Sequence, residues 1–133
     1  MGCDLSKVAN KFTDPADTVR GENGIVYQDK KILFLGIDHA GKTSLLIQYK
    51  ERQFSNTVPT VGLNVEQIPY QNRYMLTMWD VGGQATKLWK HYFDKIDAIL
   101  FVIDAHAAIK DPNGKAMQKS KTELHRMAKD AAL

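Results

Sequence analysis

The chain has a single cysteine, no long apolar run and no strong excess of either charge. Cys3 alone cannot form an internal disulfide, and one free thiol suits a reducing cytosol. No apolar run approaches the ~20 residues that a membrane-spanning helix needs, and no signal-peptide pattern is present. The formal net charge is only +3 over 133 residues, which argues against a nucleic-acid partner. A composition of 44% hydrophobic and 25% charged residues fits one ordinary globular domain.

The first 30 residues differ in pattern from the rest. Leu5, Val8 and Phe12 recur at helical spacing within residues 2–12, and Pro15 disfavours helix at the residue before it. We therefore expect residues 1–30 to form an amphipathic helix and a linker, with residues 31–133 as the folded domain. The apolar stripe of the helix suits either core packing or membrane contact. A turn signal at residues 21–24 is typical of a small hairpin within the linker.

The extreme N-terminus carries a lipidation pattern. Met1-Gly2-Cys3-Asp4-Leu5-Ser6 matches the pattern for myristoylation of Gly2 after removal of the initiator methionine. Cys3, directly beside it, is placed to accept palmitate, although an unreacted thiol is the simpler alternative. The sequence thus predicts that any membrane contact is made through the N-terminus.

From Lys31 onward, strand and helix patterns alternate. We expect strands at residues 32–35, 63–70, 74–80 and 98–103, and helices at 43–52, 89–93 and 117–131. The alternation predicts an α/β fold with a mostly parallel sheet flanked by helices. The runs 32–35 and 98–103 are continuously apolar, which predicts strands that are buried on both faces. Ligands of such sheets bind at the carboxyl ends of the strands.

A glycine-rich loop lies between the first of these strands and the first helix. Residues 36–43, GIDHAGKT, match G-x-x-x-x-G-K-[ST] in the strand–loop–helix context that the P-loop motif requires. Backbone N–H groups of such a loop surround phosphate oxygens, Lys42 reaches the outer phosphates, and the Thr43 hydroxyl binds Mg²⁺. The side chain of His39 has no required role in the motif, and we expect it to be solvated. The predicted nucleotide-binding residues of this segment are Gly36, Ile37, Asp38, His39, Ala40, Gly41, Lys42, Thr43 and Ser44.

Two further segments complete the predicted site. Asp80-Val81-Gly82-Gly83-Gln84 follows a strand, so Asp80 is placed to hold Mg²⁺, Gly83 to offer its N–H to a terminal phosphate and Gln84 to orient the attacking water. Thr60, in the loop Pro59-Thr60-Val61-Gly62, offers a second hydroxyl to Mg²⁺. Each segment alone is also typical of an ordinary turn. Only their combination with the P-loop indicates a nucleotide-binding site.

The strings GIDHAGKT, PTVGLNVE and WDVGGQ, followed by LWKHYF, resemble those of the ADP-ribosylation-factor (Arf/Arl/Sar) family of small GTPases. The resemblance implies a Ras-like P-loop fold and a GTP/GDP switch with Mg²⁺, in which residues 54–66 and 80–93 are the switch regions. It also implies that the hairpin between them slides on GTP binding and expels the N-terminal helix. Partners implied are an exchange factor, a GTPase-activating protein and effectors. The implied setting is vesicle trafficking, with a cytoplasmic protein held peripherally on Golgi or other endomembranes or on the plasma membrane.

The sequence also departs from that family. An Asn-Lys-x-Asp string, whose Asp bonds the guanine ring, does not occur in residues 1–133, so we expect a C-terminally truncated or divergent member that lacks the last strands and the C-terminal helix. Loss of two charge-assisted hydrogen bonds would weaken guanine binding about 10²- to 10⁴-fold. No arginine falls in a matched catalytic position, so fast hydrolysis would need an arginine from a partner. The alternatives are a nucleotide-poor interaction module and, less favoured, a P-loop ATPase.

Overall fold

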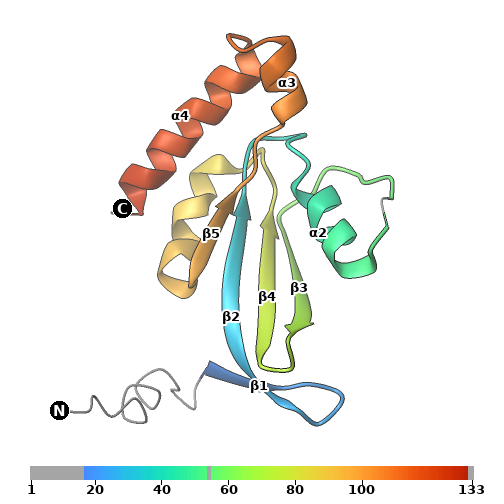
Figure 1. Ribbon diagram of the computed structural model, residues 1–133. Helices are drawn as coiled ribbons and strands as arrows, with labels where there is room; N and C mark the ends of the chain where they lie inside the picture. The colour runs from blue at the N-terminus through green and yellow to red at the C-terminus, as the bar shows by residue number, and fades with distance from the viewer. Residues whose placement is uncertain (1–16, 54, 132–133) are drawn as a thin grey trace, which may run out of the picture.

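Five strands form one sheet in the computed structural model, which describes residues 17–53 and 55–131. They are β1 (Thr18–Arg20), β2 (Val26–Leu35), β3 (Leu63–Tyr70), β4 (Tyr74–Val81) and β5 (Ala98–Phe101). The order across the sheet is β1-β2-β4-β3, and β5 pairs with β2 (Figure 1). β2 is parallel to β4 and β5, whereas the β1–β2 and β3–β4 pairs are antiparallel.

Helices lie on both sides of this sheet (Figure 1). They are α2 (Lys42–Glu51), the 3₁₀ helix η2 (Thr86–Lys95), α3 (Ala105–Lys110) and α4 (Lys115–Asp130). The predicted α/β fold with flanking helices is therefore confirmed. None of the described helices is long and apolar enough to cross a membrane.

β2 is the centre of the core because its alternate side chains enter two different clusters. Leu33 and Leu35 pack on one face of the sheet with Val81, Trp89 of η2 and Met127 of α4. Phe34 points to the other face and packs with Leu46 of α2 and Met78 of β4. A continuous apolar run was expected to be buried on both faces, and this strand satisfies that expectation. The two clusters fix the carboxyl end of β2, from which the glycine-rich loop leaves.

The first strand begins earlier than predicted. It was expected at residues 32–35 after a linker, but β2 starts at Val26 because its first residues pair with β1 through Thr18↔Gln28 and Arg20↔Val26. The turn at residues 21–24 joins the two strands, so the predicted small hairpin is confirmed. The expected amphipathic helix of residues 2–12 lies outside the described residues.

The prediction that residues 98–103 form a fully buried strand was wrong. β5 ends at Phe101, and Leu100 keeps 45% of its surface exposed. Among the described residues β5 has only β2 as a neighbouring strand, so its other edge and much of one face stay open. In the described part of the chain β5 is therefore an apolar edge strand that no further strand covers. α3 was not expected; Asp104 caps it by accepting hydrogen bonds from the His106 and Ala107 N–H groups at 2.9 and 3.2 Å.

Candidate nucleotide-binding site

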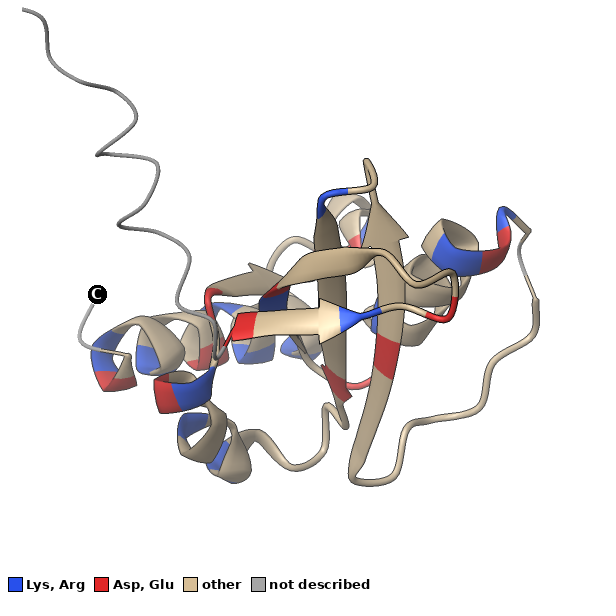
Figure 2. Cartoon of the chain, turned by 90° about the horizontal axis from the view of Figure 1, so that it is seen from below, with Lys and Arg blue, Asp and Glu red and all other residues tan. Residues whose placement is uncertain are grey.

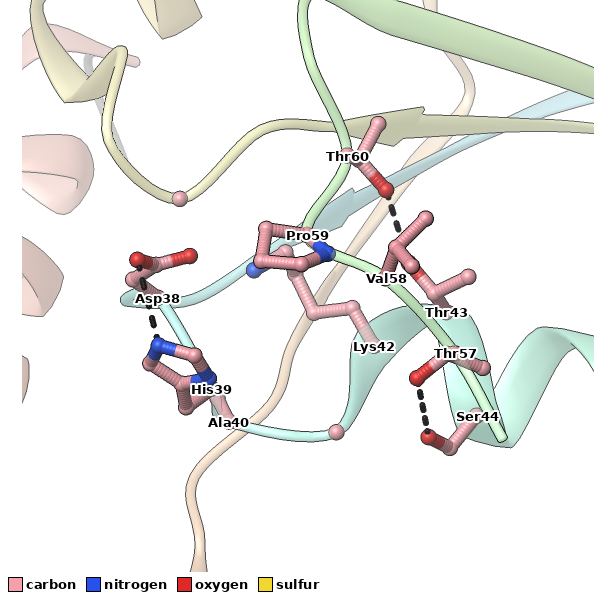
Figure 3. A pocket seen from close by; sticks show the side chains of 12 residues that line it. Asp38, His39, Ala40, Lys42, Thr43, Ser44, Thr57, Val58, Pro59 and Thr60 are labelled. Carbon is pink, nitrogen blue, oxygen red and sulfur yellow. Dashed lines mark hydrogen bonds and ion pairs between the residues drawn. The ribbon is translucent and has the colours of Figure 1, made fainter. Parts of the chain in front are cut away.

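The glycine-rich loop connects the end of β2 to the first turn of α2. Gly41, directly before the helix, has φ 93°, a left-handed conformation that glycine adopts without strain. This turn brings the N-terminus of α2 to the edge of a cavity of about 120 Å³. The cavity is lined by the loop, by the segment 57–60 and by Gly83 (Figure 3). The lining residues are Asp38, His39, Ala40, Gly41, Lys42, Thr43, Ser44, Thr57, Val58, Pro59, Thr60 and Gly83.

Lys42 is buried against this loop, with 6% of its surface exposed. Its Nζ donates to the carbonyl oxygens of Gly36 and Ile37, each at 3.0 Å. Burial lowers the pKa of the Lys42 ammonium, and the neighbouring carboxylates of Asp80 and Asp38 partly oppose that shift. A buried ammonium whose charge is only partly balanced favours an anionic ligand in the adjoining cavity.

Three oxygen-bearing side chains from three separate segments converge beside Lys42. Thr43 Oγ1 donates to Asp80 Oδ2 at 2.5 Å, Thr60 Oγ1 donates to the same oxygen at 3.1 Å, and the two hydroxyl oxygens lie 2.8 Å apart. Asp80 is fully buried, and its Oδ1 has no hydrogen-bond partner among the described residues. Hydroxyl and carboxylate oxygens are the ligands that Mg²⁺ prefers, and a buried carboxylate oxygen without a partner is an available ligand. These residues fit a magnesium ion.

The segment after β4 closes over the loop. A Cβ added at Gly83 would approach the backbone nitrogen of Asp38 to 2.4 Å, so only glycine permits this close contact. The next residue, Gln84, is exposed, and its Nε2 donates to Asp38 Oδ2 at 3.0 Å. That hydrogen bond is the main cause that lowers the pKa of Asp38; burial opposes it, while the charges of His39, Lys42 and Lys119 reinforce it.

All predicted site residues from Gly36 to Gln84 lie in this one region. The cavity or its immediate hydrogen bonds include Asp38 to Ser44, Thr60, Asp80, Gly83 and Gln84, while Gly36 and Ile37 accept from Lys42. Sequence reasoning missed Thr57, whose Oγ1 lies 3.3 Å from Ser44 Oγ. In the sequence, Thr57 is only one more hydroxyl residue in the loop that contains Thr60. Hydroxyl residues are too common in loops to predict a contact. The lipidation residues Gly2 and Cys3 lie outside the described residues.

The charges around the site have both signs. Figure 2 shows Lys and Arg positions interspersed with Asp and Glu positions over several elements rather than gathered on one. Ion pairs such as Lys50–Glu66 at 2.8 Å and Arg126–Glu123 on α4 tie neighbouring opposite charges together. Opposite charges are thus interspersed along the described residues, and the local cation at Lys42 is the charge that matters for the site.

The sequence model of the ADP-ribosylation factor family matches residues 19–133. This chain belongs to the ADP-ribosylation factor family. The match begins within β1 and includes the loop, Lys42 and the Thr43–Thr60–Asp80 cluster, so the site lies wholly within the family's domain.

Two solved structures are similar to this chain in fold. The Arl6 BBS3 small GTPase from Trypanosoma brucei, solved with the nucleotide analogue GppNp bound, is 31% identical with a TM-score of 0.61, and the match covers 76% of this chain and 55% of that one. The mammalian SRP receptor matches with a TM-score of 0.65 at 20% identity, covering 76% of this chain and 54% of that one, and shows likeness of fold alone. The chain spans little more than half the length of either structure.

Proposed function

We propose that this chain is a guanine-nucleotide-binding switch that holds GTP or GDP with Mg²⁺ and hydrolyses GTP slowly. The observation that carries the proposal is the convergence of Thr43, Thr60 and the buried Asp80 beside Lys42 at the mouth of one cavity. Family membership and 31% identity to a small GTPase solved with GppNp support guanosine as the nucleoside.

Different residues of the cavity would contact the phosphates and the metal ion. Lys42 supplies a positive charge to the outer phosphates, and the N–H groups at the start of α2 add the helix dipole. Thr43, Thr60 and Asp80 would hold Mg²⁺, directly or through water, and that ion neutralises charge on the phosphates. Gly83 lies close enough to the loop to present its N–H toward a terminal phosphate.

In this proposal Gln84 would be the residue that acts on water. Its amide nitrogen is held at Asp38, at the end of the cavity formed by residues 38–40, which leaves the amide oxygen able to accept a hydrogen bond from water. No arginine from the described residues lines the cavity. Since an arginine accelerates this class of reaction about 10³- to 10⁵-fold, unaided turnover should be slow and should respond to a partner that supplies one.

The Thr60 loop supplies the switch. Val58 and Val61 are 82% and 96% exposed, so the loop has little core packing of its own. It is held by the Thr60–Asp80 and Thr57–Ser44 contacts and by the hydrogen bond from the Gly82 N–H to the Gly62 carbonyl at 2.9 Å. Loss of a terminal phosphate would remove negative charge next to the proposed magnesium site of Thr43, Thr60 and Asp80. The loop would then lose a contact that orders it and could adopt another conformation.

The most informative experiment is mass spectrometry of the purified chain under native and denaturing conditions. A guanine nucleotide released on denaturation would support the proposal. An adenine nucleotide would support the P-loop ATPase alternative instead. Purified protein with no nucleotide, and with no affinity for GDP and Mg²⁺ in titration, would contradict the switch. It would favour the interaction module, for which the exposed Val58 and Val61 already provide an apolar surface.

The family setting extends the proposal to membranes. We propose that myristoylation of Gly2, with palmitate on Cys3 or the Leu5/Val8/Phe12 stripe as a second anchor, holds the chain peripherally on endomembranes or the plasma membrane for vesicle trafficking. A single myristoyl chain gives only marginal, reversible binding, with a partition constant near ~10⁴ M⁻¹, so a second signal is required. Exchange factors, activating proteins and effectors would contact the segments 54–66 and 80–93.

A further inference from the structure

We infer that Gly82 is a positioning residue. Because it has no side chain, the Thr60 loop (residues 57–62) can close on Asp80, and this closure favours a nucleoside triphosphate over a diphosphate. The inference rests on the proposed function, because it concerns the loop that would respond to the terminal phosphate. Gly82 directly follows β4, the strand that carries Asp80, and it does not itself line the nucleotide cavity.

The Thr60 loop packs against the backbone of Gly82 and leaves no space for a side chain there. A Cβ added at Gly82 would lie 2.6 Å from the carbonyl oxygen of Thr60 and 3.6 Å from the backbone nitrogen of Gly62. The first distance is well inside van der Waals contact, and the atom that it meets belongs to the backbone, which cannot turn aside as a side chain can. Gly82 is not among the described glycines with a left-handed φ, so it is this contact, and not backbone strain, that requires glycine.

Hydrogen bonds bring the same two segments together. β3 pairs with β4 along its whole length, and one step beyond the last pair the Gly82 N–H donates to the Gly62 carbonyl at 2.9 Å. Two residues before Gly62, the Thr60 hydroxyl donates to Asp80 Oδ2 at 3.1 Å. The close approach at Gly82 therefore lies between the end of the strand pairing and the proposed metal ligand, where it limits how far Thr60 can reach.

Few other contacts hold the loop in this position. Its apolar side chains add little core packing, because Val58 and Val61 are largely exposed. Its contact with α2 at Thr57 is also exposed, with 3.3 Å between the two hydroxyl oxygens. In Gly82→Ala the backbone of the loop has to withdraw from the segment after β4, and no buried side chain opposes that movement. The Thr60 hydroxyl then loses its contacts in the proposed magnesium site.

The position of the loop matters for the number of phosphates that the site favours. A terminal phosphate with its Mg²⁺ would favour the closed loop, since the Thr60 hydroxyl is one of the proposed metal ligands. A diphosphate would depend chiefly on the glycine-rich loop and on Lys42, which a Cβ at Gly82 would not contact. A ligand shifts a conformational equilibrium only by its differential affinity for the two states. Opposing closure should therefore weaken triphosphate binding and leave diphosphate binding almost unchanged.

The test compares the affinities of the whole chain for GppNp and GDP, each with Mg²⁺, by calorimetric titration. Gly82→Ala should weaken GppNp binding about ten- to hundredfold, the equivalent of two hydrogen bonds, and GDP binding by less than about threefold. Gly24→Ala, in the turn between β1 and β2, is the control for the loss of a glycine. Gly24 has φ 76° and nothing within 4 Å of an added Cβ, so this variant should be less stable but keep the wild-type ratio of the two affinities.

A double variant distinguishes this role from a general structural one. Thr60→Ala removes the hydroxyl that closure brings to Asp80, so Gly82→Ala added to it should weaken GppNp binding by less than about a further threefold. Costs that simply add in the double variant would mean that Gly82 acts through some other contact, and they would overturn the inference.

Amide hydrogen exchange in the wild-type chain tests the same contact without a substitution. The Gly82 N–H donates to the Gly62 carbonyl in the closed loop, so its exchange should be at least about tenfold slower with GppNp than with GDP. Equal exchange with the two nucleotides would contradict the inference. A wild-type chain that binds no guanine nucleotide would overturn the proposed function and the inference with it. Tight binding whose affinity ratio is unchanged in Gly82→Ala would overturn the role of Gly82 alone.

Discussion

Asp80→Asn should separate the stability of the ligand-free chain from its capacity to bind Mg²⁺ and nucleotide. The carboxylate is fully buried, and one of its oxygens has no partner among the described residues. Asparagine keeps an acceptor oxygen for the Thr43 and Thr60 hydroxyls, and its amide NH₂ group takes the place of the oxygen without a partner. A buried polar group without a partner costs about 1–3 kcal/mol in either protein, so the ligand-free variant should unfold close to the wild-type temperature.

The effect on ligand binding should be much larger. At GDP and Mg²⁺ concentrations a hundredfold above Kd, wild type gains about 2.7 kcal/mol of stability. For a domain of this size that free energy raises the unfolding temperature by about 10 °C. If loss of the carboxylate weakens binding about a hundredfold, the same ligand concentration equals the new Kd and the gain falls to about 0.4 kcal/mol, or less than about 2 °C.

The assay is thermal unfolding of both proteins with chelator alone and with GDP plus Mg²⁺. Asp94→Asn, the same substitution at an exposed position of η2, is the matched control and should keep the full wild-type shift. An Asp80→Asn protein that keeps the full Mg²⁺-dependent shift would refute the assignment of Asp80 as a magnesium ligand. A ligand-free variant destabilised by several kcal/mol would refute the reasoning about the unpartnered oxygen.

Four further predictions follow from the same site and from the N-terminus. Lys42→Ala should weaken GDP binding at least about 10²-fold in calorimetry because it removes the buried ammonium, while Lys90→Ala on η2 should bind as wild type; equal affinities would mean that the loop does not hold phosphate. Gln84→Leu should bind GTP within about twofold of wild type but hydrolyse it at least about tenfold more slowly in single turnover, and a wild-type rate would remove Gln84 from the mechanism. The polypeptide of residues 1–133 should discriminate GDP from ADP weakly in competition titrations, because it contains no Asn-Lys-x-Asp string; strong selectivity would mean that another segment contacts the base. Gly2→Ala should abolish flotation of the myristoylated chain with liposomes and Cys3→Ser should reduce retention in cells; flotation of Gly2→Ala would place the anchor elsewhere.

Elements set by local sequence were predicted closely. The hairpin of β3 and β4 has the expected strands, and its turn at Gln71 and Asn72 places both residues at positive φ, 52° and 51°. Two consecutive left-handed residues are the signature of a tight hairpin, and asparagine favours that conformation. The start of α2 follows equally from the loop motif, since Gly41 allows the turn that precedes the helix.

Elements that depend on neighbours were predicted less well. The apolar run in β2 and the one in β5 look alike in sequence, yet Leu33 is fully buried and Leu100 is 45% exposed. The difference is one of position in the sheet, because β2 has strands on both edges and β5 has a neighbour on only one among the described residues. Periodicity shows that a strand can be buried, but it does not show what covers it.

The site, too, has contacts that local sequence predicts and contacts that depend on neighbouring elements. That Lys42, Thr43 and Asp80 lie together could be predicted, because motif spacing after a strand carries their position. The contacts of Asp38 with Gln84 and of Ser44 with Thr57 could not be predicted, because they join segments whose approach is decided by packing of the whole sheet. The loop motif specifies backbone conformation, and it leaves open which side chains at the tip meet the segment after β4.

The site has a well-packed part and an exposed part, and under the proposed function this division would let a small ligand act as a switch. Lys42, Thr43 and Asp80 are anchored to β2, α2 and β4, whose side chains form the two core clusters. Thr60 and Gln84 belong to exposed segments that reach the cavity through a few hydrogen bonds, among them those of Thr60 to Asp80 and of Gln84 to Asp38. Each such bond contributes about 1 kcal/mol net, so the free energy that orders these segments is small compared with the stability of the core. Under the proposed function, one phosphate with its metal ion would shift them between arrangements without disturbing the sheet, as a nucleotide-controlled surface requires.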